Sequence, residues 1–149
     1  MKKYIILELI PTASTKERGD IIQLSALKLN ELNLIDRFDY RITDDKIPLT
    51  DLKEMINYDN DKFIYKNTTE EILNEFKTWS EELPLLILNN GYTLDYLKEL
   101  KNKKEDISEY INIPYTDDII DKIIKKYNLE PSNYIVDLLY EAIIYENNK

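Results

Sequence analysis

A single carboxylate interrupts the first apolar stretch of this sequence. Residues 4–10 are almost continuously apolar and rich in β-branched side chains, apart from Glu8. This pattern is typical of a strand that is buried on both faces of a sheet. Burying a carboxylate there without a partner is costly. We therefore expect Glu8 at an open strand end, in a salt bridge, or on a metal ion.

The composition excludes several kinds of catalysis. The 149 residues contain no cysteine and no histidine. Disulfides, thiol nucleophiles, cysteine-based zinc sites and imidazole catalysis are therefore excluded, as are most transition-metal sites. The chemistry that remains open to Glu8 is that of a carboxylate, which can hold Mg²⁺ through its oxygen atoms.

Composition and charge also bound the class of protein. With 43% hydrophobic and 33% charged residues and two glycines, the chain has an ordinary globular composition, and we expect residues 1–149 to form a single domain. The net charge of -9, from 29 acidic and 20 basic side chains, opposes tight nonspecific binding to duplex phosphates. A local basic patch remains compatible with it.

The N-terminus does not have the pattern of a signal peptide. Met1, Lys2 and Lys3 provide a positive start, but the apolar run that follows contains Glu8 and lacks a small-residue cleavage site. No run approaches the roughly 18 apolar residues of a membrane span. We expect a soluble, cytoplasmic protein that does not contact a membrane.

The elements that position Glu8 are predicted to be three antiparallel strands, residues 4–10, 20–29 and 37–42. Residues 11–19 are too few for a crossover helix, which excludes a flavodoxin-like parallel sheet, and residues 30–33 have the composition of a hairpin turn. In the third strand Phe38, Tyr40 and Ile42 alternate with charged residues. This alternation predicts one face exposed to water.

Helical spacing appears in the rest of the chain. A capping box at residues 68–71 predicts a helix that begins after Thr68 and buries Trp79. Residues 85–88 are predicted to form a buried strand and residues 111–114 a short one, while Thr116 is expected to cap the next helix. Further helices are predicted at residues 49–56, around the lysine-rich end at 101–104, and from Pro131 onward.

The opening of the chain resembles the DEDD-family 3′-to-5′ exonucleases of the proofreading type. Residues 8–13 stand where that family has the strand end Asp-x-Glu-Thr-Thr-Gly, and residues 20–29 resemble its second strand, Ile-Ile-Glu-Ile-Gly-Ala-Val-Lys-Val. The resemblance implies an α/β fold: a ribonuclease H-like mixed sheet of about five strands, the first three antiparallel, with helices on both faces. It also implies carboxylates that hold two Mg²⁺ ions and a histidine base.

The first catalytic motif departs from the family pattern. Glu8 stands where the family has Asp, Ile10 where it has Glu, Pro11 where it has Thr, and Ala13 where it has Gly. Ile10 therefore removes one metal ligand in any alignment.

The third carboxylate of the family can be aligned in two frames. If residues 89–90 stand for its His-Asn pair, the metal-binding Asp has become Leu94; if the frame slips by one residue, Asp95 keeps the carboxylate. Without the resemblance, Asp95 is expected in the first turn of a helix capped by Thr93.

The last motif has the same ambiguity. Asn133 with Leu138 fits the apolar face of the final helix better, whereas Ser132 with Asp137 keeps the acid but turns it toward water. The family variant with Tyr four residues before the Asp does not match, because Tyr134 is three residues before Asp137.

Three functions are compatible with these observations. The first is a catalytically degenerate exonuclease-fold protein that binds a protein partner or, weakly, nucleic acid, with no cofactor expected. The second is an active exonuclease in which Glu8, Asp95 and Asp137 bind Mg²⁺ and are the catalytic residues. The third is an acidic inhibitor of a basic nucleic-acid-binding protein. The partner, the choice between DNA and RNA, and the oligomeric state are left open.

Overall fold

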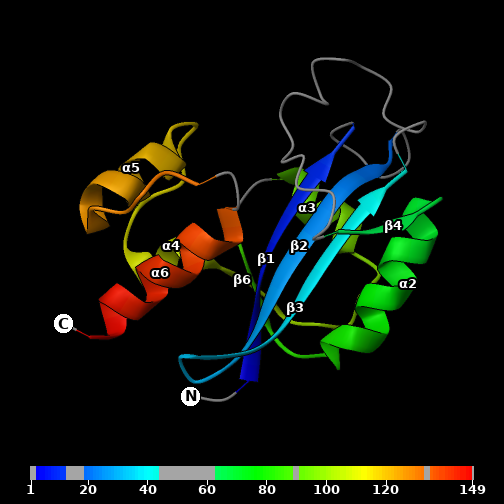
Figure 1. Ribbon diagram of the computed structural model, residues 1–149, viewed down its shortest axis with the longest axis horizontal. Helices are drawn as coiled ribbons and strands as arrows, with labels where there is room; N and C mark the ends of the chain where they lie inside the picture. Colours follow the sequence, from blue (N-terminus) through cyan, green and yellow to red (C-terminus); the bar gives the residue numbers. More distant parts are fainter. Residues whose placement is uncertain (1–2, 13–18, 44–62, 89–90, 133–134, 149) are drawn as a thin grey trace.

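The central feature of the fold is a six-stranded sheet with the order β4-β3-β2-β1-β5-β6 (Figure 1). It is seen in a computed structural model that describes residues 3–12, 19–43, 63–88, 91–132 and 135–148. The strands are β1 (Lys3–Pro11), β2 (Ile21–Asn30), β3 (Asn33–Ile42), β4 (Ile64–Lys66), β5 (Leu85–Ile87) and β6 (Lys104–Asp106). The sheet has one strand more than the sequence predicted.

The strand directions confirm the predicted mixed sheet. β1 and β2 are antiparallel, with Glu8 opposite Ser25, and β2 and β3 are antiparallel, with Ser25 opposite Asp39. β5 is parallel to β1, β6 is parallel to β5, and β4 is parallel to β3. The short connection between β1 and β2 permits only the antiparallel arrangement, because a parallel pair needs a longer crossover.

Helices cover both faces of this sheet (Figure 1). They are α2 (Thr69–Ser80), α3 (Gly91–Leu97), α4 (Ile107–Ile111), α5 (Ile119–Tyr127) and α6 (Ile135–Asn147). Successive side chains of β1 point to opposite faces, so Ile5 and Leu7 pack with α2 and α3, while Tyr4 and Ile6 pack with α4, α5 and α6. No helix of the described ranges is long and apolar enough to span a membrane.

The start of α2 is as predicted. Thr68 Oγ1 accepts a hydrogen bond of 3.1 Å from the backbone N–H of Glu71, which satisfies one of the free N–H groups of the first turn. Trp79 packs against Phe38 and Phe76, with ring centroids 5.3 and 5.8 Å away. Trp79 is half-buried and packs against the core, as predicted.

Two predictions for residues 101–114 are wrong. Residues 111–114 do not form a strand, because Ile111 ends α4 and Asn112 has left-handed backbone angles. The strand lies instead at Lys104–Asp106, and its three charged residues show no period-two pattern. The lysine-rich helix end predicted at 101–104 is therefore also wrong, since α3 ends at Leu97. Asp106 Oδ1 accepts from Ser108 N at 3.0 Å and so begins α4.

The two predicted caps other than Thr68 are also corrected. Thr93 lies inside α3, which begins at Gly91. Thr116 is not the cap of α5, whose N-cap is Asp118; its hydroxyl donates to Asp118 Oδ1 at 2.6 Å. The helix predicted at residues 49–56 lies outside the described residues.

The charged face of β3 is largely buried. Arg41 is 1% exposed and Asp39 is 8% exposed. The prediction was wrong because the alternation in a strand shows only that two faces differ. Here Asp137 of α6 pairs with Arg37 of β3, and the Phe63 ring lies over Arg41.

Candidate functional site

The sheet register places Glu8 within a group of polar side chains on the face toward α6. Residues directly opposite one another on antiparallel strands share a face, so Glu8, Ser25 and Asp39 form one row across β1, β2 and β3. We call this the Glu8 row. The sheet therefore gathers polar groups from three strands that are separate in the sequence.

A second row lies next to the Glu8 row on the same face. It consists of Ile10, Gln23 and Arg41, each two residues from its neighbour in the Glu8 row, and we call it the Arg41 row. Gln23 and Ser25 are each 1% exposed, and the Gln23 amide donates to Ser25 Oγ at 3.3 Å. The two rows therefore contact each other through neutral polar groups.

The carboxyl group of Glu8 has an unusual environment. Glu8 is half-buried, and burial raises the pKa of its carboxyl group from the ordinary value of 4.5 to about 8. Burial likewise raises the pKa of the nearby Tyr92 phenol, with smaller contributions from Tyr115 and from Glu8 itself. Near pH 7, Glu8 is therefore mostly protonated and uncharged.

Asp137 lies in α6 and is bound by an arginine. Its Oδ1 accepts a hydrogen bond of 2.8 Å from Arg37 Nη1, and Arg37 Nε donates to Asp39 Oδ2 at 3.1 Å. Burial alone would lower the pKa of the Arg37 guanidinium, but the hydrogen bonds with the two carboxylates together raise it. Arg37 thus balances the charges of the buried Asp39 and the half-buried Asp137.

Asp95 lies on α3, apart from the polar rows. It forms an ion pair of 3.6 Å with Lys98 one turn along the helix. Its neighbour Leu94, which occupies the metal position in the other frame, is 39% exposed. By contrast Leu138, the alternative to Asp137, is 1% exposed, as expected for the apolar face of α6.

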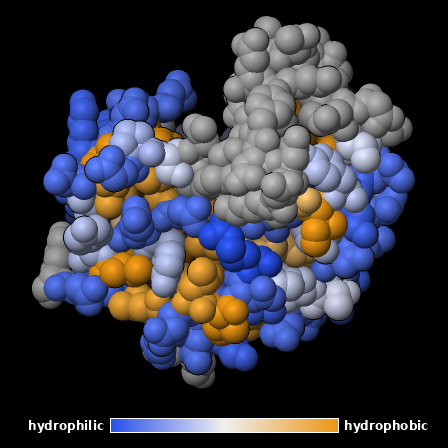
Figure 2. All heavy atoms as spheres, viewed as in Figure 1, coloured by the Kyte–Doolittle hydropathy of each residue, from blue (hydrophilic) through white to orange (hydrophobic). Residues whose placement is uncertain are grey.

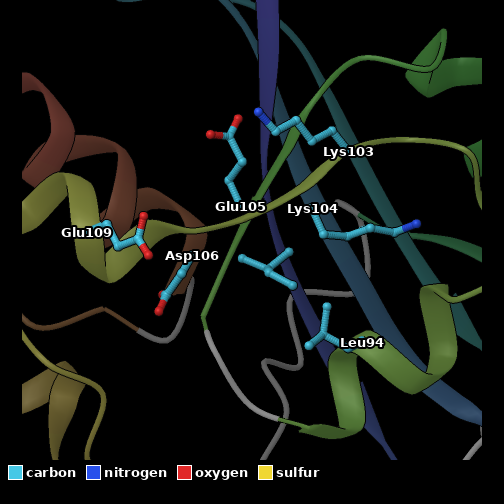
Figure 3. Close-up of a pocket in the computed structure, with 7 residues that line it drawn as sticks. Leu94, Lys103, Lys104, Glu105, Asp106 and Glu109 are labelled. Atoms are coloured by element: carbon cyan, nitrogen blue, oxygen red, sulfur yellow. The ribbon is translucent and has the colours of Figure 1, made fainter.

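A hollow of about 410 Å³ lies beside Leu94. Figure 3 shows Leu94 pointing toward β6, between Lys104 on one side and Asp106 and Glu109 on the other. Ile87, Lys103 and Glu105 complete its lining. Glu8, Asp95 and Asp137 are not among these residues, so the hollow does not join the predicted carboxylates.

The predicted carboxylates do not form a cluster. Within the ranges that the structure describes, no three acidic side chains lie close enough together to hold a metal ion. Since Glu8, Asp95 and Asp137 are all described, the structure does not bring the three together.

Sequence reasoning missed the arginines of β3. Arg41 Nε donates to Gln23 Oε1 at 3.0 Å, and its guanidinium carbon lies 3.8 Å from the centroid of the Phe63 ring. Among the described residues, four buried side-chain atoms have no hydrogen-bond partner: Arg37 Nη2, Asp39 Oδ1, Arg41 Nη2 and Thr43 Oγ1. The available signal was the charged alternation in β3, which had been interpreted as a water-exposed face.

Comparison with known proteins identifies the class of fold. No protein-family model matches this sequence, and no curated protein matches it. The chain is similar to solved structures of exonuclease I: one in complex with the inhibitor BCBP, with a TM-score of 0.58 and 13% identity, and the zinc-bound form of the E. coli enzyme with single-stranded DNA, with a TM-score of 0.60 and 13% identity.

These structures extend well beyond the present chain. The alignments with the inhibitor complex and the DNA complex each cover 98% of this chain and 40% of the exonuclease I chain. A third, the ExoI/SSB-Ct complex, has a TM-score of 0.57, 14% identity and the same coverage. The chain therefore has a ribonuclease H-like, exonuclease-type fold and spans about two-fifths of the exonuclease I chains; at this identity the likeness shows the fold alone.

Proposed function

We propose that this protein uses an exonuclease fold for binding rather than for metal-dependent hydrolysis. The observation that carries this proposal is the pairing of Asp137 with Arg37 at 2.8 Å. A carboxylate that already balances an arginine is a poor candidate for one of several ligands around two Mg²⁺ ions.

The other predicted ligands support the same proposal. Ile10 carries no ligand atom in any frame. The raised pKa of Glu8 leaves its carboxyl group mostly neutral near pH 7, and hard cations favour charged oxygen ligands. Asp95 is paired with Lys98 on α3. The side chains, as placed, do not fit a two-metal site.

We propose a protein as the main partner. The net charge of -9 disfavours a tight grip on a phosphate backbone, whereas a protein can be bound through acidic or apolar surface. Figure 2 shows such apolar surface in patches between hydrophilic side chains on one face. Exonuclease I has been solved with SSB-Ct and with single-stranded DNA, which makes binding to a protein or a nucleic acid a reasonable proposal for this fold.

A nuclease assay tests the proposal. We expect that the protein, with Mg²⁺ or Mn²⁺, shortens 5′-labelled single-stranded DNA or RNA no faster than a Glu8→Ala variant prepared in the same way. Metal-dependent shortening from the 3′ end that Asp95→Asn or Asp137→Asn abolishes in a folded variant would contradict it. That result would favour an active exonuclease that uses Glu8, Asp95 and Asp137.

A further inference from the structure

Arg41 is a buried cation that has no carboxylate partner among the described residues. Its side chain is 1% exposed, its Nε–H is used by the neutral Gln23 amide, and Nη2 has no hydrogen-bond partner. The guanidinium stays charged at any pH a protein tolerates. A buried charge is normally balanced by an opposite charge, because its removal from water is otherwise uncompensated.

Arg37 provides an internal comparison. It lies on the same face of β3, four residues before Arg41, and it pairs with Asp39 and Asp137. Both nearby acids are thus engaged by Arg37. The charges of this region are unevenly distributed: one arginine has two acidic partners and the other has neutral Gln23 and the Phe63 ring.

The surroundings of Arg41 suit an anion better than a cation. Next to it in the Arg41 row is the Gln23 amide, followed by the Ser25 hydroxyl in the adjacent row. Neither group carries a charge. Among the described residues, the nearest acid on this face is Asp39, two residues before Arg41 on β3, and its charge is balanced by Arg37 through Oδ2. A guanidinium presents its N–H groups in a fixed plane that matches the oxygen atoms of phosphate, which Lys cannot reproduce.

We propose that Arg41 binds a phosphate group, with Nη2 donating a hydrogen bond to a phosphate oxygen. The phosphate can be free in solution or part of a nucleotide, because both present the same oxygen atoms. Phe63 lies over the guanidinium, so binding requires this cover to shift. The inference does not depend on whether the protein hydrolyses nucleic acid.

Thermal unfolding of the full chain tests the proposal. The Tm of wild type, Arg41→Met and Arg37→Lys is measured at increasing concentrations of inorganic phosphate. Potassium chloride at the same ionic strength is the control. We expect a saturable rise in Tm for wild type and Arg37→Lys, and an apparent affinity at least about tenfold weaker in Arg41→Met, since ligand binding to the folded state stabilises it. Because phosphate also stabilises proteins by exclusion from their surface, an equal rise in wild type and Arg41→Met would overturn the proposal.

A second measurement covers the case in which Arg41→Met does not fold. The chain has three arginines, Arg18, Arg37 and Arg41, so their Nε–H resonances can be assigned by single Arg→Lys substitutions. We expect phosphate to shift the Arg41 resonance saturably and the other two much less. No shift, or an equal shift of all three, would overturn the proposal.

The source of the phosphate is distinguished by a thymidine dinucleotide with a 5′ phosphate. Binding at least about tenfold tighter than inorganic phosphate, and lost in Arg41→Met, identifies a nucleic acid end. Equal binding of both probes by wild type, again lost in Arg41→Met, identifies free phosphate. A dinucleotide that binds wild type and Arg41→Met alike, with no effect of inorganic phosphate, would contradict a phosphate site at Arg41.

Discussion

Arg37 Nη1 lies 2.8 Å from Asp137 Oδ1, which joins β3 to α6 across 100 positions of the chain. Both side chains are about one-third exposed, at 30% and 34%. The pair joins the last helix to the edge of the antiparallel meander, and it engages the carboxylate of Asp137, one of the predicted metal ligands.

Asp137→Asn is expected to destabilise the protein by about 1–2 kcal/mol, because a charge-assisted hydrogen bond between half-buried partners is lost. Urea unfolding followed by circular dichroism measures this change. Glu141→Gln is the control: it lies exposed on the same helix and should change the free energy of unfolding by less than about 0.5 kcal/mol. If the two variants lose equal stability, the ion pair does not fix α6.

The raised pKa of Glu8 predicts a pH dependence of stability. The pKa of Glu8 is about 8 in the folded state, whereas the ordinary value, which applies to the unfolded chain, is 4.5. As the pH rises, the unfolded chain therefore releases the proton first. The stabilisation from Glu8 is fully present below pH 4.5 and is lost as the pH rises toward 8.

Glu8→Gln keeps the neutral form and should remove this dependence. In the pH range between the two values, the stability of wild type relative to Glu8→Gln should fall by up to about 1.4 kcal/mol per pH unit. Urea unfolding of both proteins from pH 5 to 8 measures the difference. Parallel curves would show that Glu8 is ionised in the folded protein.

The cap of α2 offers a third test. Thr68→Ala should cost about 1 kcal/mol, because the N–H of Glu71 loses the hydroxyl that accepts its hydrogen bond. Thr78→Ala is a matched control, since Thr78 is exposed on the same helix and alanine has the higher helix propensity. Thermal or urea unfolding should therefore show a lower stability for Thr68→Ala than for Thr78→Ala. An equal loss of stability in both variants would show that Thr68 does not stabilise α2 as its cap.

Binding to nucleic acid should be weak and sensitive to salt. The net charge of -9 repels phosphates at long range, and any contact through basic residues weakens as salt increases. Fluorescence anisotropy with labelled oligothymidylate at about 50 and 200 mM salt measures this. Tight binding that persists at the higher concentration would contradict a protein as the main partner.

Much of the fold could be predicted from the sequence, because local physical rules control it. The connection at residues 11–19 is too short for a parallel crossover, so β1 and β2 had to be antiparallel. The Thr68 cap and the helical spacing after it predicted α2 and the burial of Trp79. The short, continuously apolar run at residues 85–88 predicted the buried strand β5.

The candidate site was less accessible, because it depends on contacts between distant parts of the chain. The presence of Ile10 and the absence of histidine could be read directly from the sequence. The role of Asp95 could not be predicted, because a sequence pattern cannot distinguish two alignments with the family that differ by one residue. The helix cap expected at Thr93 lies within α3.

The sequence by itself determined which residues alternate along β3 and which carry charge, since both follow from covalent order and the two-residue period of a strand. The folded structure was needed to show that Arg37 pairs with both Asp39 and Asp137, and that Arg41 is buried beside Gln23 with no acid partner among the described residues. Burial and charge pairing arise where separate segments pack together, and no local pattern contains that information.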